Sequence, residues 1–246
     1  MELCDLQNSW KNISPERWAE IEENVAAAEA EAMAKIGNTP EQLAKWKLIK
    51  NSSLSQHEVE KKTLDTYKPE NDTAKEALRR FQAWEPHSNN GTCFGYFVYG
   101  PVGTGKTHLT KGLLIKWAAT GRTCKFTTVA ELMDEIKGAM NRDSKISVLE
   151  TIQKYADYDI LALDDFGAER TTEFTQEKFL SILETRLRIG RPTFVTSNLI
   201  GEDLKSRYDI RILDRLRELF LFLQVTGASY RAKIHSDRKQ DHNNEG

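Results

Sequence analysis

The sequence has few residues that would build a covalent or metal framework. Its 246 residues include three cysteines, Cys4, Cys93 and Cys124, with no CxxC pair and no nearby histidine spacing. A disulfide scaffold or a zinc site needs several ligands at short, defined spacings. We therefore expect the three thiols to be structural or incidental.

Long apolar segments are missing as well. No apolar run approaches the roughly 18 residues that a membrane helix needs. The opening residues, MELCDLQNSW, lack the basic and apolar regions of a secretory signal. From these absences we expect a cytoplasmic protein with no membrane partner.

Charge of one sign is not in large excess. The chain has 35 Lys and Arg against 37 Asp and Glu. Residues 1–60 carry six basic and eleven acidic side chains, net −5, which leaves 29 and 26, net +3, for the remainder. A protein that grips duplex DNA normally shows a larger basic footprint, whereas a local groove for single-stranded DNA is compatible with these charges.

The first 55 residues are rich in helical signals. Ser14-Pro15 and Thr39-Pro40 each place a capping side chain before a proline, as at a helix start. Apolar residues then follow at spacings of three or four. We expect residues 1–55 to form an acidic helical hairpin that acts as a small N-terminal partner-docking domain. Packing onto its own core would also explain its tryptophans, which are Trp10, Trp18 and Trp46.

From residue 56 onward the pattern changes. A linker and lead-in helix occupies residues 56–92, and strand and helix signals alternate over residues 93–235. Five apolar runs predict strands: YFVYG, CKFTTV, ILALDD, TFVTSN and FLFLQV. Several are continuously apolar, which indicates an α/β fold with a five-stranded, mainly parallel sheet between helices. We expect the polar residues 236–246 to be a disordered tail.

A phosphate-binding pattern follows the first predicted strand. Residues 100–107, GPVGTGKT, match G-x-x-x-x-G-K-[ST] and open a predicted helix, as this pattern requires. Its glycines let backbone N–H groups turn toward phosphate oxygens, and the helix N-terminus adds partial positive charge. We expect ATP here, with Lys106 on the β and γ phosphates and the Thr107 hydroxyl on Mg²⁺. The predicted nucleotide-binding residues are Gly100, Pro101, Val102, Gly103, Thr104, Gly105, Lys106, Thr107 and His108.

Another buried strand ends in two aspartates. Asp164 and Asp165 follow ILAL at the carboxyl end of the strand, where open α/β sheets bind ligands. We expect Asp164 to hold Mg²⁺ through water and Asp165 to orient or deprotonate the attacking water. Many ATPases carry Glu at the second position. The shorter Asp165 therefore leaves a binding module without hydrolysis open, and Glu169 is a weaker substitute for it.

Further polar and aromatic residues have less specific signals. Asn198 ends TFVTSN, and its amide could hold a water near the γ-phosphate. An ordinary transition from strand to turn would show the same residues. The basic run KSRYDIRILDRLRE is typical of a solvated helix face, and an arginine finger toward a neighbouring subunit is the functional alternative. Phe126 and Tyr208 are candidates for stacking on bases, with core packing an equal explanation for Phe126.

Taken in order, these motifs resemble the AAA+ ATPases of the DnaC/DnaI helicase-loader group and their close relative, the IstB transposition ATPase. The resemblance covers roughly residues 60–235 and rests on TLDTYKPEN, GPVGTGKTHL, LALDDFGAER, PTFVTSN, ILDRLR and GASYR. It implies that Asn198 is sensor 1, Arg215 the arginine finger and Arg231 the sensor-2 arginine that reads the γ-phosphate. Only fifteen residues follow Arg231, so we expect no large helical lid.

The resemblance also implies a function. Members of this group commonly self-associate through their ATP sites and act on a hexameric, ring-shaped replicative DNA helicase. We therefore expect an ATP-dependent loader of that helicase onto single-stranded DNA, with a slow ATPase that partner or DNA stimulates. The zinc-binding front domain of DnaI-type loaders has no ligands here, which favours a DnaC-like or phage-type variant. An IstB-like assistant of a transposase stays open, and a P-loop small-molecule kinase fits Asn198 and the SYR ending less well.

Overall fold

A computed structural model describes residues 40–86, 95–141 and 144–230 of the chain. By its internal contacts the chain divides into two compact units, Met1–Lys47 and Leu48–Gly246. The first helix of the expected hairpin, with Trp10 and Trp18, lies outside the described residues. So do Cys4, Cys93, Arg231 and the tail 236–246. No described helix is both long enough and apolar enough to cross a membrane.

Three described helices precede the first strand: α3 (Pro40–Ser52), α4 (Gln56–Lys61) and α5 (Asp72–Ala83). The α3 helix begins at the proline of the predicted Thr39-Pro40 start. Between α3 and α4 the chain turns, and Leu54 is buried there against Val59 and Ile115. This turn, residues 53–55, is therefore anchored in the second unit by an apolar contact.

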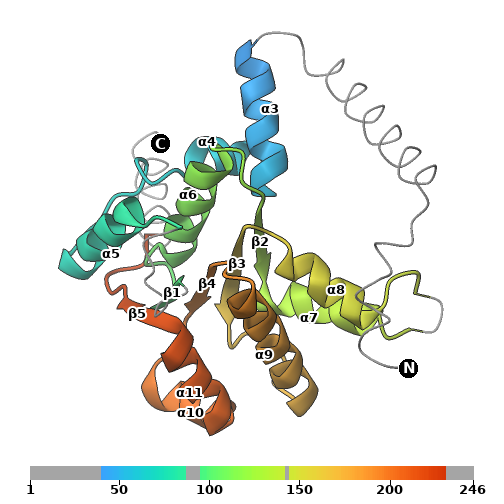
Figure 1. The fold of residues 1–246 in the computed structure, drawn as a ribbon. Coiled ribbons are helices and arrows are strands. Elements are labelled where there is room, and N and C mark those ends of the chain that lie inside the picture. Colours follow the sequence, from blue (N-terminus) through green and yellow to red (C-terminus); the bar gives the residue numbers. More distant parts are fainter. Residues whose placement is uncertain (1–39, 87–94, 142–143, 231–246) are drawn as a thin grey trace, which may run out of the picture. The chain divides into compact units, whose positions relative to one another are not determined.

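The five predicted strands all form. They are β1 (Gly95–Tyr99), β2 (Cys124–Thr128), β3 (Ile160–Phe166), β4 (Thr193–Ser197) and β5 (Phe220–Gln224). Their order in the sheet is β2-β3-β4-β1-β5, and the neighbouring strands pair in parallel (Figure 1). Since all strands run the same way, their carboxyl ends meet at one edge of the sheet, where ligands bind in this class of fold.

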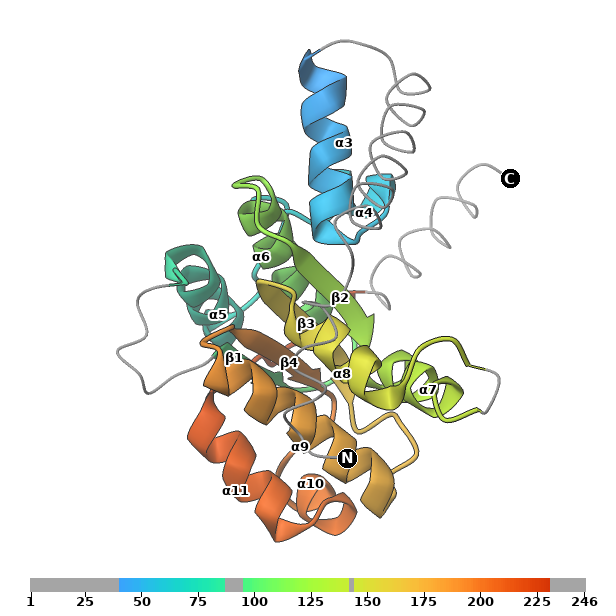
Figure 2. The ribbon, with the colours of Figure 1, turned by 45° about the vertical axis from the view of Figure 1, so that its right-hand side comes forward.

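Helices cover both faces of the sheet. The remaining ones are α6 (Lys106–Ala118), α7 (Val129–Gly138), α8 (Val148–Ala156), α9 (Glu173–Arg188), α10 (Gly201–Arg207) and α11 (Ile210–Leu219). Apolar residues of α5 and α6 pack on one face, and those of α7, α8, α9 and α11 pack on the other (Figures 1 and 2). This arrangement explains why the strands are apolar on both sides, and it confirms the predicted α/β class.

A buried arginine ties together the amino ends of β3 and β4. The Arg186 side chain is fully buried, and its guanidinium donates to the carbonyls of Ala156, Tyr158 and Pro192 at 2.9, 2.7 and 2.6 Å. Burial, assisted by nearby Arg191, lowers the pKa of Arg186 to about 9, so the group still carries its charge at neutral pH. Arg186 thus hydrogen-bonds the carbonyls at the amino edge of the sheet. The polar site lies at the opposite, carboxyl edge.

The basic run KSRYDIRILDRLRE, expected to form a helix face, is divided between two helices, α10 and α11. Tyr208 takes an extended conformation at the end of α10, with φ −124° and ψ 145°. Asp209 then caps α11 by accepting the backbone N–H of Arg211 at 2.9 Å. The reason is a tertiary contact, because the Tyr208 ring leaves the helix path to stack on Phe166 with ring centroids 4.3 Å apart.

Candidate nucleotide-binding site

A cavity of about 570 Å³ lies at the carboxyl edge of the sheet. Its lining comes from four parts of the chain: residues 102–108 after β1 with Lys111 of α6, Asp165 and Asn198 at the ends of β3 and β4, several residues between 61 and 74, and the segment after β5. Seven of the nine predicted nucleotide-binding residues, positions 102–108, therefore border one space. Gly100 and Pro101 contribute backbone carbonyls instead.

The glycines of the loop stand where a side chain would not fit. Gly103 and Gly105 have φ values of +84° and +92°, in the left-handed region that favours glycine. A Cβ on Gly103 would lie 2.1 Å from the Ser229 hydroxyl, and one on Gly105 would lie 2.6 Å from the Tyr67 ring. Gly105 caps α6 without a side-chain hydrogen bond, and the first turn has no acidic residue. This helix N-terminus therefore suits an anion.

Lys106 is held at the base of the loop. Its side chain is only 5% exposed, and the ammonium donates to the carbonyls of Gly100 and Pro101 at 2.8 and 2.7 Å. These bonds keep a buried cation next to the helix N-terminus, in the cavity lining. A phosphate oxygen is a stronger acceptor than a carbonyl because the bond to it joins two opposite charges.

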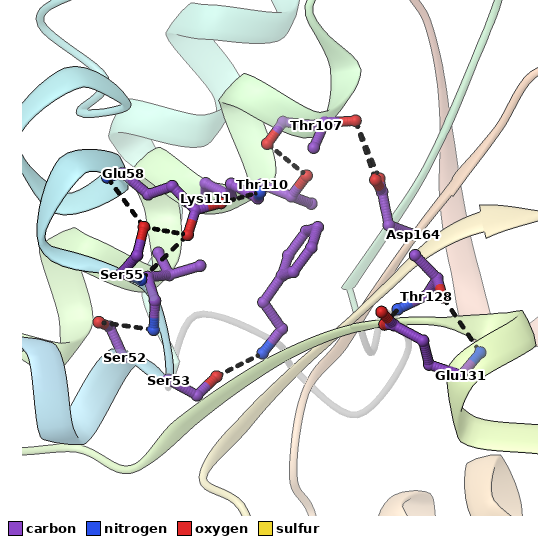
Figure 3. A network of polar contacts seen from close by, with 12 residues as sticks. Ser52, Ser53, Ser55, Glu58, Thr107, Thr110, Lys111, Thr128, Glu131 and Asp164 are labelled. Atoms are coloured by element: carbon purple, nitrogen blue, oxygen red, sulfur yellow. Dashed lines mark hydrogen bonds and ion pairs between the residues drawn. The ribbon is translucent and has the colours of Figure 1, made fainter. Parts of the chain in front are cut away.

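Asp164 faces the first turn of α6 (Figure 3). The Thr107 hydroxyl donates to its carboxylate oxygens at 3.1 and 3.0 Å, and the Thr196 hydroxyl donates to Oδ1. Asp164 is 5% exposed. Burial raises its pKa, the charge of Asp165 adds to the rise, and the Thr196 and Thr107 hydrogen bonds oppose it. The structure thus keeps a costly buried carboxylate beside a hydroxyl group.

This donor set fits Mg²⁺. One hydroxyl and one carboxylate are a small set, and the described residues contain no group of three or more His, Cys, Asp or Glu that could hold a metal. Mg²⁺ typically binds through one or two carboxylates together with phosphate oxygens and water, rather than in an all-protein cage. Thr107 and Asp164 are therefore the residues that would hold it.

Asp165 and Asn198 meet beside the cavity. The Asn198 amide donates to the Asp165 carboxylate at 3.0 Å. Asp165 has a φ of +55°, and the pairing of β3 with β4 shifts register between Leu163 and Phe166. Such a bulge re-aims side chains and is common next to active sites. It turns Asp165 toward the cavity while Asp164 points at Thr107.

The lead-in segment forms a wall of the site. His108 Nε2 lies 2.9 Å from the Thr63 carbonyl and 3.1 Å from the Thr66 hydroxyl. The Tyr67 hydroxyl donates to the carbonyl of Thr104 at 3.2 Å. Burial lowers the pKa of His108, so the neutral ring is favoured. Because the Thr63 carbonyl can only accept, the ring proton lies on Nε2. Sequence reasoning treated this segment as a linker and missed its role, because it has no periodic pattern.

The segment after β5 completes the wall. Tyr230 donates its backbone N–H to the carbonyl of Gly103 at 3.0 Å. Thr226 is held by Asn71, whose amide donates to its carbonyl at 2.7 Å, and by the hydroxyl of Thr73 at 2.9 Å. These contacts place the residues just before Arg231 against the loop. Arg231 itself lies outside the described residues, and its sensor role stays a prediction.

Arg215 does not line the cavity of its own chain. Its guanidinium donates to Glu218 at 2.8 Å and to Glu184 of α9 at 2.9 Å, and these hydrogen bonds raise its pKa. The predicted arginine finger would act on a neighbouring subunit, so its distance from the cavity is compatible with that role. The assignment stays a prediction.

Three secondary expectations change. Glu169 does not line the cavity, because its buried carboxylate accepts the Tyr208 hydroxyl and the backbone N–H of Gly167. It cannot substitute for Asp165 there. The base-stacking role suggested for Tyr208 is wrong, since its ring is buried on Phe166. Phe126 is partly buried and lies beneath the ammonium of Lys111, 4.1 Å from the ring centroid.

Residues 92–238, more than half of the chain, match the family model described as IstB-like ATP binding protein. The chain belongs to this family. ATP binding at the cavity is therefore a property expected of the family as well as of the loop geometry. The match spans all five strands and includes the loop, the paired aspartates and Asn198.

Relatives of this IstB-like protein include helicase loaders. The replicative helicase loader DnaC of Buchnera aphidicola subsp. Baizongia pistaciae (strain Bp) is 28% identical over 152 residues, 61% of this chain and 62% of the relative. The chain thus spans less than two thirds of that relative's length. The predicted resemblance to this group is confirmed.

Two solved structures share the fold. The crystal structure of the DnaC helicase loader superimposes with a TM-score of 0.56 at 24% identity, covering 67% of this chain and 96% of that one. The crystal structure of DnaI gives 0.58 at 24% identity, covering 73% and 98%. At this identity the likeness concerns the fold alone, and it agrees with the predicted α/β core built on a five-stranded sheet.

Proposed function

We propose that this IstB-like protein is an ATP-dependent loader of a replicative DNA helicase onto single-stranded DNA, acting in DNA replication as an ATP-binding and hydrolysis switch. The observation that carries the proposal is the convergence of Lys106, the Thr107–Asp164 contact and the Asp165–Asn198 contact at one cavity. That convergence supplies a phosphate cradle, a metal position and a place for a water. The similarity to loaders named DnaC supports a replicative helicase as the proposed partner.

The chain's own groups have distinct tasks in ATP hydrolysis. Lys106 and the N-terminus of α6 would hold the phosphates, and Thr107 with Asp164 would hold Mg²⁺, which supplies charge neutralisation when bound. Asp165 accepts a proton from the attacking water or orients it. Asn198 fixes the Asp165 carboxylate by donating to one oxygen and leaves the other for the water.

ATP can act as a switch only if it binds two states of the protein with different affinity. Contacts to the γ-phosphate are the natural source of that difference, since ADP lacks them. We assign these contacts to Asn198 in the same subunit, to Arg231, and to Arg215 of a neighbouring subunit. The proposal therefore includes self-association through the ATP site, and Arg215, which does not line its own cavity, would reach the site of a neighbouring subunit.

Partner binding is assigned to the front of the chain. We assign helicase docking to residues 1–55, which are acidic and contain three tryptophans, and ATP hydrolysis to a core over residues 93–235. Such a protein would work in the cytoplasm. An IstB-like assistant of a transposase is the second candidate. The observation behind it is the match to the family model described as IstB-like ATP binding protein.

Affinity purification decides between the two candidates. The tagged full chain is purified from lysate of the source cells with ATP, beside the Lys106→Ala variant and a chain without residues 1–39, which keeps α3 whole. We expect the full chain to retain the replicative helicase, the truncated chain to lose it, and the variant to retain less of it. Recovery of a transposase with no helicase would replace the loader proposal.

A further inference from the structure

A buried acid and a buried phenol meet directly behind Asp165. Glu169 and Tyr208 are each 6% exposed, and the Tyr208 hydroxyl donates to the Glu169 carboxylate. The other Glu169 oxygen accepts the Gly167 backbone N–H at 2.8 Å. Both residues are therefore fixed to the turn that follows Asp165, although neither lines the nucleotide cavity.

The turn itself has little freedom. The backbone N–H of Ala168 donates to the carbonyl of Asp165 at 3.0 Å and closes it. Gly167, with φ +96°, is pressed against the residue after Asn198, because a Cβ there would lie 2.3 Å from Leu199 Cδ1 and 3.8 Å from the Tyr208 hydroxyl. The turn can therefore shift only if Tyr208 or the end of β4 shifts with it.

Tyr208 ends α10 and directly precedes Asp209, the N-cap of α11. The next residue, Asp209, donates its backbone N–H to the Gln176 side chain of α9 at 3.0 Å and caps α11. Six residues after Asp209, α11 carries Arg215, which is paired with Glu184 of α9. Figure 2 shows α9, α10 and α11 beside one another. The phenol thus joins the turn after Asp165 to the helix of the predicted arginine finger.

Plain core packing does not account for this pair. A phenylalanine and an aliphatic residue would fill the same space without burying a carboxylate, which costs free energy unless its oxygens are hydrogen-bonded. Here two donors satisfy Glu169. Burial and the Glu169 hydrogen bond raise the pKa of Tyr208, so its hydroxyl remains a donor. A fully satisfied buried network of this kind specifies one geometry.

We propose that Glu169 and Tyr208 are positioning residues that hold Asp165 in register with α11, so that the nucleotide site and Arg215 move as one body. This inference rests on the proposed ATPase function. It predicts that removing the contact uncouples Arg215 from the nucleotide while leaving nucleotide binding intact.

The test uses the full chain with Tyr208→Phe, which removes one oxygen atom and keeps the ring stacked on Phe166. We expect kcat for ATP to fall about tenfold, since misplacement of a group by about 1 Å can cost up to a hundredfold. The ATP Kd should stay within about twofold of the wild type, because the phosphate loop is untouched. Glu169→Gln, which keeps an acceptor oxygen, should lose less activity than Glu169→Ala.

Tyr155→Phe is the matched control. Tyr155 is also a buried tyrosine whose hydroxyl donates to a glutamate, Glu135, at 2.6 Å, but it joins α8 to α7. We expect this control to lose stability as Tyr208→Phe does, with kcat unchanged. An equal fall of kcat in both variants would overturn the proposal, as would an unchanged kcat in Tyr208→Phe when the wild type hydrolyses ATP.

Hydrogen exchange provides a readout that needs nucleotide binding but no hydrolysis. With a slowly hydrolysed ATP analogue, we expect wild-type amides of residues 165–169 and 210–219 to gain protection together. In Tyr208→Phe only the first segment should gain it. Retained protection of both segments in the variant would overturn the proposal. If the wild type binds the analogue and protects both segments together but does not hydrolyse ATP, the proposed ATPase activity is contradicted. The positioning role of Glu169 and Tyr208 is then still supported.

Discussion

The hydroxyl of Thr107 reaches both carboxylate oxygens of Asp164, at 3.1 and 3.0 Å, across 57 positions of sequence. This contact joins the first turn of α6 to the end of β3, and it marks the position that we propose for Mg²⁺. It also buries a carboxylate whose pKa burial raises. The site therefore holds an acid at a cost in stability, as functional sites often do.

Asp164→Asn should stabilise the nucleotide-free protein near neutral pH. A raised pKa means that the folded state holds the Asp164 proton more tightly than the unfolded state does. The stability from this group is thus present at low pH and lost as the pH rises through its folded value. Removing the charge should increase the free energy of unfolding by about 1 kcal/mol.

The same variant should lose Mg²⁺-dependent ATP affinity about tenfold or more. Thermal unfolding without nucleotide and ATP titration with and without Mg²⁺ measure the two effects. A less stable Asp164→Asn protein near neutral pH, or unchanged Mg²⁺ dependence, would contradict the assignment of Asp164.

Lys106→Ala should abolish measurable ATP binding. The ammonium is the buried cation of the loop, and each hydrogen bond to a charged group contributes roughly 1.5–3 kcal/mol, so the affinity should fall by about a hundredfold or more, beyond what the titration detects. Titration of a fluorescent ATP analogue measures this. Lys116→Ala is the control, because Lys116 lies at the other end of α6 and bonds to the Gln82 carbonyl. Equal affinity of the two variants would sink the loop assignment.

Glu58→Gln tests the contact between α4 and α6. Lys111, which lines the cavity, donates to Glu58, and Figure 3 shows the pair beside Ser55. Burial, the largest influence, raises the pKa of Glu58, but the hydrogen bonds from Lys111 and Ser55 outweigh it and lower the pKa to about 2. The folded state therefore favours the ionised group. Its stabilisation is present above the ordinary pKa and is lost as the pH falls toward about 2.

We expect Glu58→Gln to lower the free energy of unfolding by about 1–3 kcal/mol near neutral pH. The difference from the wild type should close between pH 4.5 and about 2, the window set by the two pKa values. Denaturant titrations across this range measure it. A gap that stays constant as the pH falls would show that the ion pair is not the cause.

The sequence predicted the sheet and the loop well, because both depend on local patterns. Continuous apolar runs marked all five strands, and spacing alone identified the phosphate loop. The break at Tyr208 was not predictable, since it arises from stacking on Phe166, 42 positions earlier in the chain. The contacts of His108 with Thr63 and of Tyr67 with Thr104 were not predictable either, because no periodic sequence pattern marks them. Contacts distant in sequence, rather than local propensity, decide these features.

Arg215→Ala should spare ATP binding and reduce hydrolysis about a thousandfold, the lower end of the effect of an arginine finger. Its side chain is 38% exposed and its ion pairs lie at the surface, so little stability should be lost. Arg217→Ala is the control, because Arg217 lies on the same helix and pairs with Asp214. Steady-state ATPase assays measure both. Normal turnover in Arg215→Ala would remove the finger assignment.

The most direct test of the loader proposal is helicase loading itself. The replicative helicase of the source organism is mixed with closed circular single-stranded DNA that carries an annealed strand, and displacement of that strand is followed over time. We predict that the wild-type chain with ATP greatly accelerates displacement and that the Lys106→Ala chain does not. Displacement that is the same with and without a stoichiometric amount of the wild-type chain would contradict the account.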